Sequence, residues 1–568
     1  MSVFQSCRWT RGRVGCLCLV LTLALVLSPD SRTTALAVSR SSPGTVEVTS
    51  GDAYRFQGWG TSLAWWANVV GGWQSSKQIV DALFGLPDHE HPDRLGLNVI
   101  RYNIGASPVR WCDVDQPAGC AGEPSREGRF PVADLSRVPA CGTFGPGKAI
   151  PALADAPDEP PEIGRDRNQL EVLRAALSRQ YRGSFVLEAF ANSPPWWLTV
   201  SRCPQGNPDA FDAHYNLVSA DYGAYADYLA EVLLAFRERG IGFDTLDPLN
   251  EPENPWGQRK DIYVHHPVCT TGCQEGMHFG MKPPRLPTPS LGLLLGEVCS
   301  RLRAHAIGTR VSVPDGSNPS YTSALLALAD PAPACLGQIN THMYGPMALT
   351  SGRKALSIEA RTLSKRIWMS EFGTGGLASD MTSGLTYSSV IAADMRWLRP
   401  AAWVNWQAVE AVGGWGLFEA PTWPREGPVA RTKRFSALEQ YARFIRPGYE
   451  VLTTLDPLDD AVHERTQTMA AMDNLRHPGR IVIVGTNSQV VRRRVVYDLA
   501  SLGGQQLLTT ATVTRYRTTA AADMQRLGSA PLRATRLADD QPPGSITTYV
   551  IQLDREDPRT ALDHSARA

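Results

Sequence analysis

Two glutamates in this sequence stand in local settings that suit acid-assisted bond cleavage. Glu251 lies in Leu249-Asn250-Glu251-Pro252, and Glu371 lies in Ser370-Glu371-Phe372-Gly373. Cleavage of a glycosidic bond requires two carboxyl groups that flank the bond, one to protonate the departing oxygen and one to attack or stabilise the anomeric carbon. Either motif alone is also typical of a turn or of the start of a helix. Together, placed after two strands of one sheet, they predict a catalytic pair.

A parallel α/β barrel is the scaffold that the surrounding sequence predicts. Short β-rich runs alternate with helical stretches such as residues 222–239, where apolar residues recur at helical spacing. Eight runs are expected to be strands, at residues 54–58, 98–102, 185–191, 245–249, 310–314, 338–341, 367–370 and 402–406. This alternation predicts a (β/α)8 TIM barrel, whose catalytic residues stand at the carboxyl ends of the strands. Glu251 and Glu371 then follow the fourth and seventh strands.

The C-terminal part of the chain has a different pattern. Its β-rich runs are separated by Gly, Pro and polar turns, at residues 480–485, 494–499, 512–518 and 546–553. Such a series predicts a β-sandwich side domain. We expect residues 54–446 to form the catalytic barrel and residues 447–568 the side domain. Residues 38–53 are expected to supply an N-terminal strand that pairs with the side domain.

Residues 1–37 have the features of a secretory signal peptide. Three arginines precede an apolar run at residues 14–27, and Ala35-Leu36-Ala37 resembles a signal peptidase site. The run is shorter than the roughly 20 residues that cross a bilayer, so a retained anchor is the less favoured alternative. We therefore expect a secreted, extracellular protein with no membrane contact after signal cleavage.

Cysteine usage agrees with export. Eight cysteines follow the expected cleavage site, an even number that suggests disulfides: Cys112, Cys120, Cys141, Cys203, Cys269, Cys273, Cys299 and Cys335. Cys269 and Cys273 lie near histidines and could instead bind a metal, although their spacing fits no common zinc module well. His89-Glu90-His91 also resembles a metal triplet, but its Pro and Asp neighbours favour a solvated loop. We expect disulfides, no metal and no cofactor.

Composition excludes several classes of partner. The 56 Lys and Arg residues balance 56 Asp and Glu residues, so the chain lacks the basic excess that nucleic acid or an anionic membrane would favour. A hydrophobic content of 43% is typical of a globular protein and excludes disorder. We expect a monomer that acts on a polysaccharide or oligosaccharide and binds no nucleic acid.

Further motifs give the chain a resemblance to glycoside hydrolase family 30, within the clan A retaining (β/α)8 glycosidases. The segment that opens Phe56-Gln57-Gly58-Trp59 is similar to the first strand of the family's endo-β-1,6-galactanase branch. Asn192-Ser193-Pro194-Pro195-Trp196-Trp197, after the third strand, also resembles that family. With the two glutamate motifs, the match spans the barrel. The C-terminal segment resembles the family's side domain in position and strand content only.

The resemblance implies a role for each glutamate. Glu251 takes the position of the general acid/base and Glu371 that of the nucleophile. Glu251 should be protonated at rest through a raised pKa, and Arg101 should keep Glu371 ionised. The outcome would be retention, with carboxyl groups roughly 5–5.5 Å apart.

The same resemblance implies the residues that contact substrate. Asn250 would bind the sugar 2-hydroxyl, Tyr344 would hydrogen-bond the nucleophile, and Trp406 would lie under the sugar. Trp59 and Trp196 are the tryptophans expected to touch sugar, although packing in the core is the alternative for both. The full set of expected substrate-binding residues is Trp59, Arg101, Asn103, Trp196, Asn250, His342, Tyr344 and Trp406.

Three other acidic residues have weaker interpretations. Glu188, inside the third strand, is interpreted as a polar group of the core. Asp315 follows the fifth strand and Glu410 lies beyond the eighth, so either could bind substrate hydroxyls near the barrel mouth.

The expected activity is that of a secreted endo-β-1,6-galactanase acting on β-1,6-galactan side chains of arabinogalactan. The family's β-1,6-glucanase, glucosylceramidase and xylanase activities are alternatives, and specificity is expected to be set in residues 108–161 and 254–289. A non-catalytic carbohydrate-binding protein is a further alternative. The presence of both glutamates argues against it.

Overall fold

The structure is a computed structural model in which several stretches of the chain are described. The described residues are 44–64, 66–104, 167–192, 194–195, 198, 217, 219–252, 291–329, 334–345, 348–423, 425–459, 466–474, 479–502, 511–532 and 534–553. The expected signal peptide and the expected specificity segments at residues 108–161 and 254–289 lie outside them. None of the helices in the described ranges is both long and apolar enough to cross a membrane.

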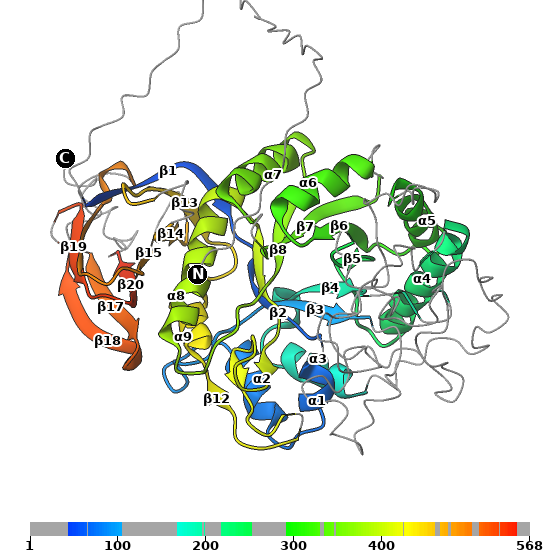
Figure 1. Ribbon diagram of the computed structural model, residues 1–568, viewed down its shortest axis with the longest axis horizontal. Helices are drawn as coiled ribbons and strands as arrows, with labels where there is room; N and C mark the ends of the chain where they lie inside the picture. Colours follow the sequence, from blue (N-terminus) through cyan, green and yellow to red (C-terminus); the bar gives the residue numbers. More distant parts are fainter. Residues whose placement is uncertain are drawn as a thin grey trace, which may run out of the picture. The chain divides into compact units, whose positions relative to one another are not determined.

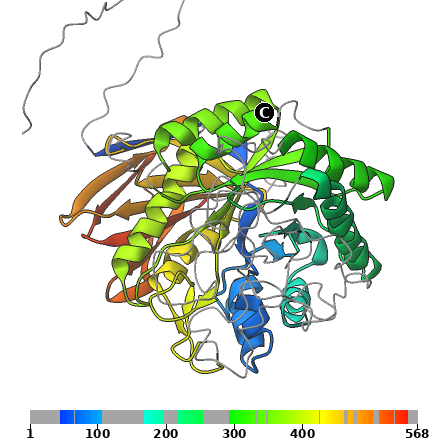
Figure 2. The ribbon, with the colours of Figure 1, turned by 45° about the vertical axis from the view of Figure 1, so that its right-hand side comes forward.

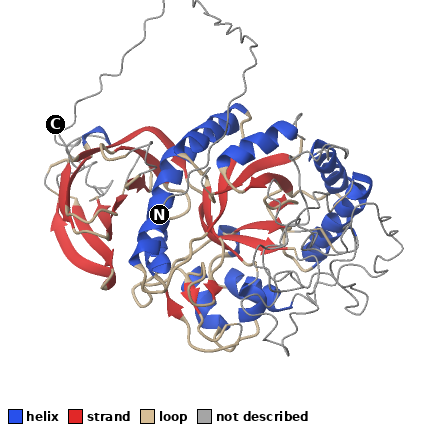
Figure 3. Ribbon diagram, viewed as in Figure 1, coloured by secondary structure: helices blue, strands red, loops and turns tan. Residues whose placement is uncertain are grey.

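Eight parallel strands close into a barrel, which confirms the predicted fold class (Figures 1 and 3). In chain order they are β2 (Gly58–Ser62), β3 (Val99–Asn103), β4 (Val186–Phe190), β5 (Thr245–Asp247), β6 (Arg310–Gly316), β7 (Leu336–His342), β8 (Arg366–Phe372) and β9 (Ala402–Asn405). β2 pairs in parallel with both β3 and β9, and these two pairings close the ring.

The predicted bounds of the first barrel strand, residues 54–58, are wrong. Residues 54 and 55 belong to β1 (Thr45–Arg55), where they pair with β13 (Glu450–Leu455), and the barrel strand begins only at Gly58. Gly58 has a φ of 148°, a conformation open to glycine but strained for other residues, so the chain turns there from one sheet into the other. A Cβ on Gly60 would lie 2.4 Å from the Val99 carbonyl oxygen, so glycine is also required for the close approach of β2 and β3.

Helices surround the barrel, as Figure 2 shows from a second side. They are α1 (Trp66–Val70), α2 (Ser76–Phe84), α3 (Arg167–Leu177), α4 (Tyr222–Glu238), α5 (Leu291–Ala304), α6 (Pro319–Leu328), α7 (Thr350–Thr362), α8 (Met381–Ala393), its π-helical continuation η8 (Asp394–Leu398) and α9 (Lys433–Ala442). Short 3-10 turns are η4 (Arg182–Ser184), η6 (Ser219–Asp221) and η9 (Ala500–Leu502). The helical spacing predicted for residues 222–239 is confirmed by α4, whose apolar side chains at positions 225, 229, 232, 233 and 236 are buried.

A second, nine-stranded sheet forms the β-rich region. Its strand order is β18-β17-β20-β15-β14-β13-β1-β16-β19. Besides β1 and β13 it contains β14 (Thr468–Met472), β15 (Arg480–Asn487), β16 (Arg493–Asp498), β17 (Thr512–Thr519), β18 (Ala522–Pro531), β19 (Arg536–Gln541) and β20 (Ser545–Gln552). The four expected strands correspond to β15, β16, β17 and β20.

This sheet folds over its own apolar core as a sandwich. In β15, a Cβ on Gly485 would lie 2.2 Å from the Tyr497 hydroxyl of β16 and 2.5 Å from Gln541 Nε2 of β19, although neither strand neighbours β15 in the sheet. Arg517 of β17 likewise pairs with Asp539 of β19 at 2.6 Å. Strands far apart in the hydrogen-bonded order therefore face one another across the core.

The barrel helices α8 and α9 pack on this sheet. Gln440 Nε2 of α9 donates to Thr518 Oγ1 of β17 at 2.8 Å, and Ser388 Oγ of α8 lies 2.7 Å from Thr486 Oγ1 of β15. A small sheet of β10 (Val409–Glu410), β11 (Phe418–Glu419) and β12 (Ala430–Arg431) follows the last barrel strand.

One of the expected disulfides is present. Cys299 of α5 is bonded to Cys335, which immediately precedes β7. The other six cysteines lie outside the described residues.

Candidate active site

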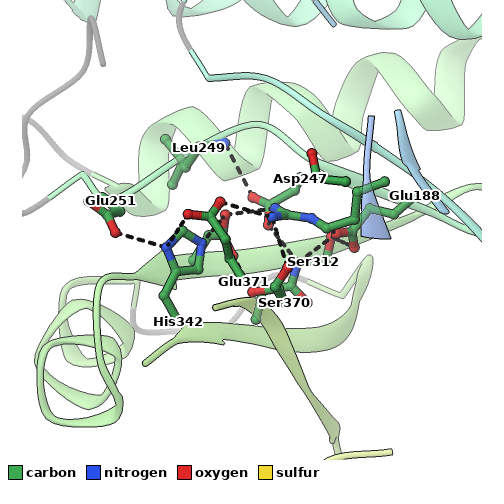
Figure 4. A network of polar contacts seen from close by, with 12 residues as sticks. Glu188, Asp247, Leu249, Glu251, Ser312, His342, Ser370 and Glu371 are labelled. Carbon is green, nitrogen blue, oxygen red and sulfur yellow. Dashed lines mark hydrogen bonds and ion pairs between the residues drawn. The ribbon is translucent and has the colours of Figure 1, made fainter. Parts of the chain in front are cut away.

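The two predicted glutamates lie together at the carboxyl ends of the barrel strands. Glu251 follows β5, Glu371 is near the end of β8, and His342 ends β7 between them (Figure 4). His342 Nδ1 lies 2.9 Å from Glu251 Oε1 and 3.6 Å from Glu371 Oε1. The facing nitrogen and oxygen atoms of all three side chains are within 4.8 Å of one another. The fold therefore brings together the carboxylates that strand-end motifs predicted.

A strained turn positions Glu251. Its φ is 41°, and its backbone N–H donates to the carbonyl oxygen of Asp315, which itself has a φ of 56°. Left-handed conformations of non-glycine residues cost on the order of 1–3 kcal/mol each and persist only where the surroundings enforce them. The end of β6 thus helps to hold the Glu251 carboxylate in place.

Arg101 of β3 lies beneath these carboxylates and is fully buried. Its Nε donates to Glu188 Oε1 and its Nη2 to Asp315 Oδ2, both at 2.8 Å. Nη1 lies 3.5 Å from Glu371 Oε2, and Nη2 lies 3.6 Å from Asp247 Oδ2. The expected proximity of Arg101 to Glu371 is therefore observed. The expectation that Arg101 contacts substrate is wrong, because protein atoms enclose the guanidinium.

Glu188 is a polar group of the core, as interpreted from sequence. Its Oε1 accepts from Arg101 and from Asn340 Nδ2, and its Oε2 accepts from Thr245 and Ser312 hydroxyls at 2.8 and 2.7 Å. Because each oxygen has at least two donors, Glu188 stabilises the buried guanidinium rather than facing the barrel mouth.

Asp315 belongs to the same buried network. Its Oδ1 accepts from the Ser370 hydroxyl at 2.6 Å, and its Oδ2 lies 2.8 Å from Arg101 Nη2 and 3.0 Å from His342 Nε2. Burial opposes its ionisation, but the charges of Arg101 and His342 outweigh burial and lower the pKa of Asp315. Since Asp315 is fully buried, the suggestion that it binds substrate hydroxyls is wrong.

His342 is also buried, and both of its ring nitrogens face carboxylates. Burial disfavours the imidazolium, but Asp315 and Glu371 outweigh burial and raise the pKa of His342 well above its ordinary value. The expectation of direct substrate contact is therefore not met. His342 is instead a cation held between three acids.

Glu371 differs from the sequence-based expectation in its protonation. Burial raises the pKa of Glu371 to about 8, with Glu251 acting in the same direction and His342 and Arg101 in the opposite one. Although Arg101 is close, desolvation outweighs its attraction in the free site. The surroundings therefore favour the protonated form of Glu371 more than the sequence-based expectation allowed.

Trp59 is a core residue, contrary to the expectation that it touches sugar. It is only 1% exposed, and its indole Nε1 donates to the Ile445 carbonyl oxygen at 2.8 Å. Its ring packs against Phe56 and against Tyr441 of α9, with centroid separations of 4.7 and 5.8 Å. The alternation of strand side chains directs it outward, into the layer between barrel and helix. The other expected platform, Trp196, lies outside the described residues.

Trp406 and Tyr344 lie at the catalytic end of the barrel. Trp406 follows β9 and packs edge-on against Phe190, the last residue of β4, with a centroid separation of 6.4 Å. The Tyr344 ring stands at right angles to His342, 5.8 Å away. Burial and the charges of Glu371 and Glu251 raise the pKa of Tyr344 well above its ordinary value. Asn250, next to the acid, is 4% exposed. Their substrate roles stay predictions.

Asn103 retains a free amide in this region. Asn192 Nδ2 lies 3.5 Å from Asn103 Oδ1, whereas Asn103 Nδ2 and Asn192 Oδ1 have no hydrogen-bond partner among the described residues. Both side chains are buried. Buried amides without partners are uncommon, so these atoms are suited to receive sugar hydroxyls.

Trp415 is an aromatic residue that sequence reasoning missed. It is 41% exposed, and its ring lies 5.5 Å from that of Tyr344. A Cβ on Gly373, two residues after Glu371, would lie 3.2 Å from the Trp415 ring, so the two loops are in close contact. Glu410 Oε2 accepts the Trp415 backbone N–H, which assigns Glu410 a contact that holds this loop. A tryptophan flanked by Gly413, Gly414 and Gly416 was the available signal.

No metal is expected from the sequence, and the described residues contain one cluster of potential metal ligands. Glu251, His342 and Glu371 are the group, among the described residues, whose ligand atoms come close enough to hold a cation. The ring nitrogens of His342 are already directed at Glu251 and Asp315. His89, Glu90 and His91 are all exposed, and the Cys269–Cys273 segment lies outside the described residues.

Sequence comparisons find similarity to known glycosidases. A family model described as O-Glycosyl hydrolase family 30 matches residues 162–264, which include Glu251. Endo-beta-1,6-galactanase from Hypocrea rufa is 28% identical over 407 residues, covering 71% of this chain and 74% of that protein. Exo-beta-1,6-galactobiohydrolase from Bifidobacterium longum subsp. longum is 29% identical over 252 residues, covering 37% of this chain and 15% of that protein.

Among solved structures, the catalytic domain of GH30 xylanase C from Talaromyces cellulolyticus has a similar fold. It superposes with a TM-score of 0.59 at 17% identity, covering 89% of this chain and all of that one. At this identity the likeness supports the fold alone.

Proposed function

We propose that this glycoside hydrolase belongs to family 30 and is a secreted, retaining endo-β-1,6-galactanase. Its substrate would be the β-1,6-galactan side chains of arabinogalactan. Both curated relatives above are named for β-1,6-linked galactose, which favours this substrate over the alternatives of β-1,6-glucan, glucosylceramide and xylan.

The observation that carries the retaining mechanism is the separation of Glu251 and Glu371. One carboxylate oxygen of Glu251 and one of Glu371 lie within 4.8 Å of each other. Inverting enzymes hold their carboxyl groups about 6.5–9.5 Å apart to admit a water molecule, whereas retaining enzymes hold them about 5–5.5 Å apart. The short separation supports direct attack by one carboxylate on the anomeric carbon.

The proposed reaction has two displacements. In the first, Glu251 donates its proton to the departing glycosidic oxygen while ionised Glu371 attacks the anomeric carbon, forming a glycosyl ester. In the second, Glu251 accepts a proton from water, and the water oxygen displaces Glu371 from the sugar. Two inversions restore the original β configuration.

Neighbouring side chains support these steps. Arg101 and His342 provide positive charge to the Glu371 carboxylate when it ionises. Asn250, which precedes Glu251 in the chain, would bind the 2-hydroxyl, where a hydrogen bond can strengthen as positive charge develops on the sugar. A non-catalytic carbohydrate-binding role is less well supported, because binding alone does not require two carboxylates at this separation.

Export is part of the proposal. The expected signal peptide at residues 1–37 and the Cys299–Cys335 disulfide both suit an oxidising compartment. The protein is proposed to act outside the cell as a monomer.

Product analysis tests this function. The mature chain and its Glu371→Gln variant are incubated with arabinose-trimmed β-1,6-galactan, and new anomeric signals are followed by NMR. Short galacto-oligosaccharides that appear first as the β-anomer, and only with the unmodified chain, are the expected result. First appearance of the α-anomer would refute retention. Turnover of β-1,6-glucan, glucosylceramide or xylan, with none of galactan, would refute the proposed substrate.

A further inference from the structure

His342 occupies an unusual position between the two glutamates. Its Nδ1 is 2.9 Å from Glu251 Oε1, a hydrogen-bond distance, and 3.6 Å from Glu371 Oε1, just beyond one, so a single ring nitrogen lies beside both glutamates. The ring itself is fully buried. Figure 4 shows the imidazole lying between Glu251 on one side and Glu371 on the other.

Asp315 keeps the ring in this orientation. Its Oδ2 lies 3.0 Å from His342 Nε2, on the side of the ring opposite Nδ1. Asp315 is itself held by Arg101 and by the Ser370 hydroxyl, and its left-handed backbone is bonded to the Glu251 N–H. Rotation of the imidazole would break the contact with Asp315, so Nδ1 stays directed at the glutamates.

We propose that His342, anchored by Asp315, is a positioning residue that keeps one proton shared between Glu251 and Glu371 by presenting its Nδ1–H to whichever of them is ionised. The inference rests on the proposed function, in which these glutamates are acid/base and nucleophile. It adds a route by which the resting site reaches its reactive protonation state.

Transfer of one proton between Glu371 and Glu251 requires a group that can both donate and accept it. In one arrangement, here called the resting one, the imidazole carries both ring protons, Glu371 carries one proton, and Nδ1–H faces Glu251 without a proton on that carboxylate. In the reactive site the imidazole again carries both protons, Glu251 carries one and Glu371 is ionised. The two states have the same number of protons and the same net charge. Conversion requires only that Nδ1 pass its proton to Glu251 and take the proton from Glu371.

The observed distances match the resting state. The shorter contact, to Glu251, is expected when that carboxylate is the ionised one. The same contact recurs after the first displacement, when Glu371 is esterified and Glu251 must act as a base. Among the described residues, the charged and titratable groups that face His342 are Asp315 from β6, Glu251 after β5, Glu371 from β8 and Tyr344 after β7.

Two substitutions are expected to move the pH profile in opposite directions. His342→Gln removes a positive charge, so ionisation of either glutamate becomes less favourable, and both limbs of the kcat/KM profile should move up by about one pH unit. Asp315→Asn removes a negative charge and weakens the imidazolium, so the basic limb should move down by a similar amount. The substrate is an aryl β-glycoside that the unmodified enzyme cleaves.

The control is His305→Gln, at an exposed site on the far end of α5, and its profile should match that of the unmodified enzyme. Thermal unfolding establishes that each variant is folded. Lower rates with both limbs unmoved would show that His342 has only a structural role and would overturn the proposal. Absence of turnover of any β-glycoside by the unmodified enzyme would instead count against the proposed function.

An NMR titration of the same proteins does not depend on turnover. With ¹³C-labelled histidine, the His342 signal, assigned by its loss in His342→Gln, should remain that of an imidazolium well above the pH at which an ordinary histidine loses its proton. In Asp315→Asn its titration should move to lower pH. A neutral His342 ring at pH 6 in the unmodified protein would overturn the proposal.

Discussion

The backbone N–H of Glu251 donates to the carbonyl oxygen of Asp315 at 3.0 Å, and both residues have left-handed backbone conformations. The position of Glu251, the proposed acid/base, therefore depends on the end of β6 as well as on β5, which precedes it. Asp315 also contacts Arg101 and His342. Asp315 thus links the backbone of Glu251 with the charged groups around Glu371.

Glu251→Gln is expected to separate protonation of the leaving group from attack. Galactan needs its departing oxygen protonated, so its turnover should fall by about 10²–10⁴-fold. An aryl glycoside with a nitrophenolate leaving group needs little protonation, so its glycosylation step should fall far less. Pre-steady-state rates of aryl release measure that step. An equal loss on both substrates would contradict the role of Glu251 as the acid.

The stability of the protein should depend on the pKa of Glu371. Burial raises that pKa from an ordinary 4.5 to about 8, so between these pH values the folded chain binds more protons than the unfolded chain. The contribution of Glu371 to the free energy of unfolding therefore falls as pH rises from about 5 to about 8. Glu371→Gln should be more stable than the unmodified protein by on the order of 4 kcal/mol at pH 8 and nearly equal to it at pH 4.

Denaturant unfolding at pH 4, 6 and 8 measures this difference, with exposed Glu90→Gln as the control. A difference between Glu371→Gln and the unmodified protein that is constant across the three pH values would show that the Glu371 pKa is not raised.

Trp59→Ala should damage the fold rather than substrate binding. Removal of a fully buried indole is expected to cost about 3–5 kcal/mol of unfolding free energy. At a temperature where the variant is folded, KM should change less than twofold. A large rise in KM without loss of stability would show instead that Trp59 contacts substrate.

Trp415→Ala should have the opposite effect. Its ring is exposed beside Tyr344 and can stack on the apolar face of a sugar. Loss of that surface should raise KM for galactan about 5- to 20-fold, with little change for a small aryl glycoside that does not extend beyond the reacting sugar. Tyr181→Ala, which removes a ring that is 86% exposed just before η4, is the matched control. Equal KM values for Trp415→Ala and the control would exclude Trp415 from the binding surface.

Much of the fold followed from local patterns. Alternation of β-rich and helical runs predicted the barrel because each strand is a short buried run bounded by turns, and the glutamate motifs stood at strand ends. The register of the first strand could not be found in this way. Residues 54–62 form one continuous stretch of strand-like sequence, and only the φ of Gly58 and its approach to Asn98 divide it between two sheets.

The buried network was less accessible to sequence reasoning. The sequence around Asp315 and Glu188 does not show that both contact Arg101, because that contact depends on the fold. The pKa of Glu371 depends on the balance between burial and four charged neighbours, which requires distances. The orientation of Trp59 depends on which side chains of the first strand point into the barrel. Because the predicted bounds of that strand were wrong, this orientation could not be predicted.

The identity of the nucleophile is tested most directly by trapping the covalent intermediate. A 2-deoxy-2-fluoro-β-galactoside with a good leaving group should form a long-lived ester, because fluorine disfavours the positive charge that develops at the anomeric carbon in both steps. Mass spectrometry of the digested protein should find one added fluoro-sugar on the peptide that contains Glu371, and none in Glu371→Gln. A label on Glu251, or turnover of the compound with inversion and no label, would contradict the mechanism.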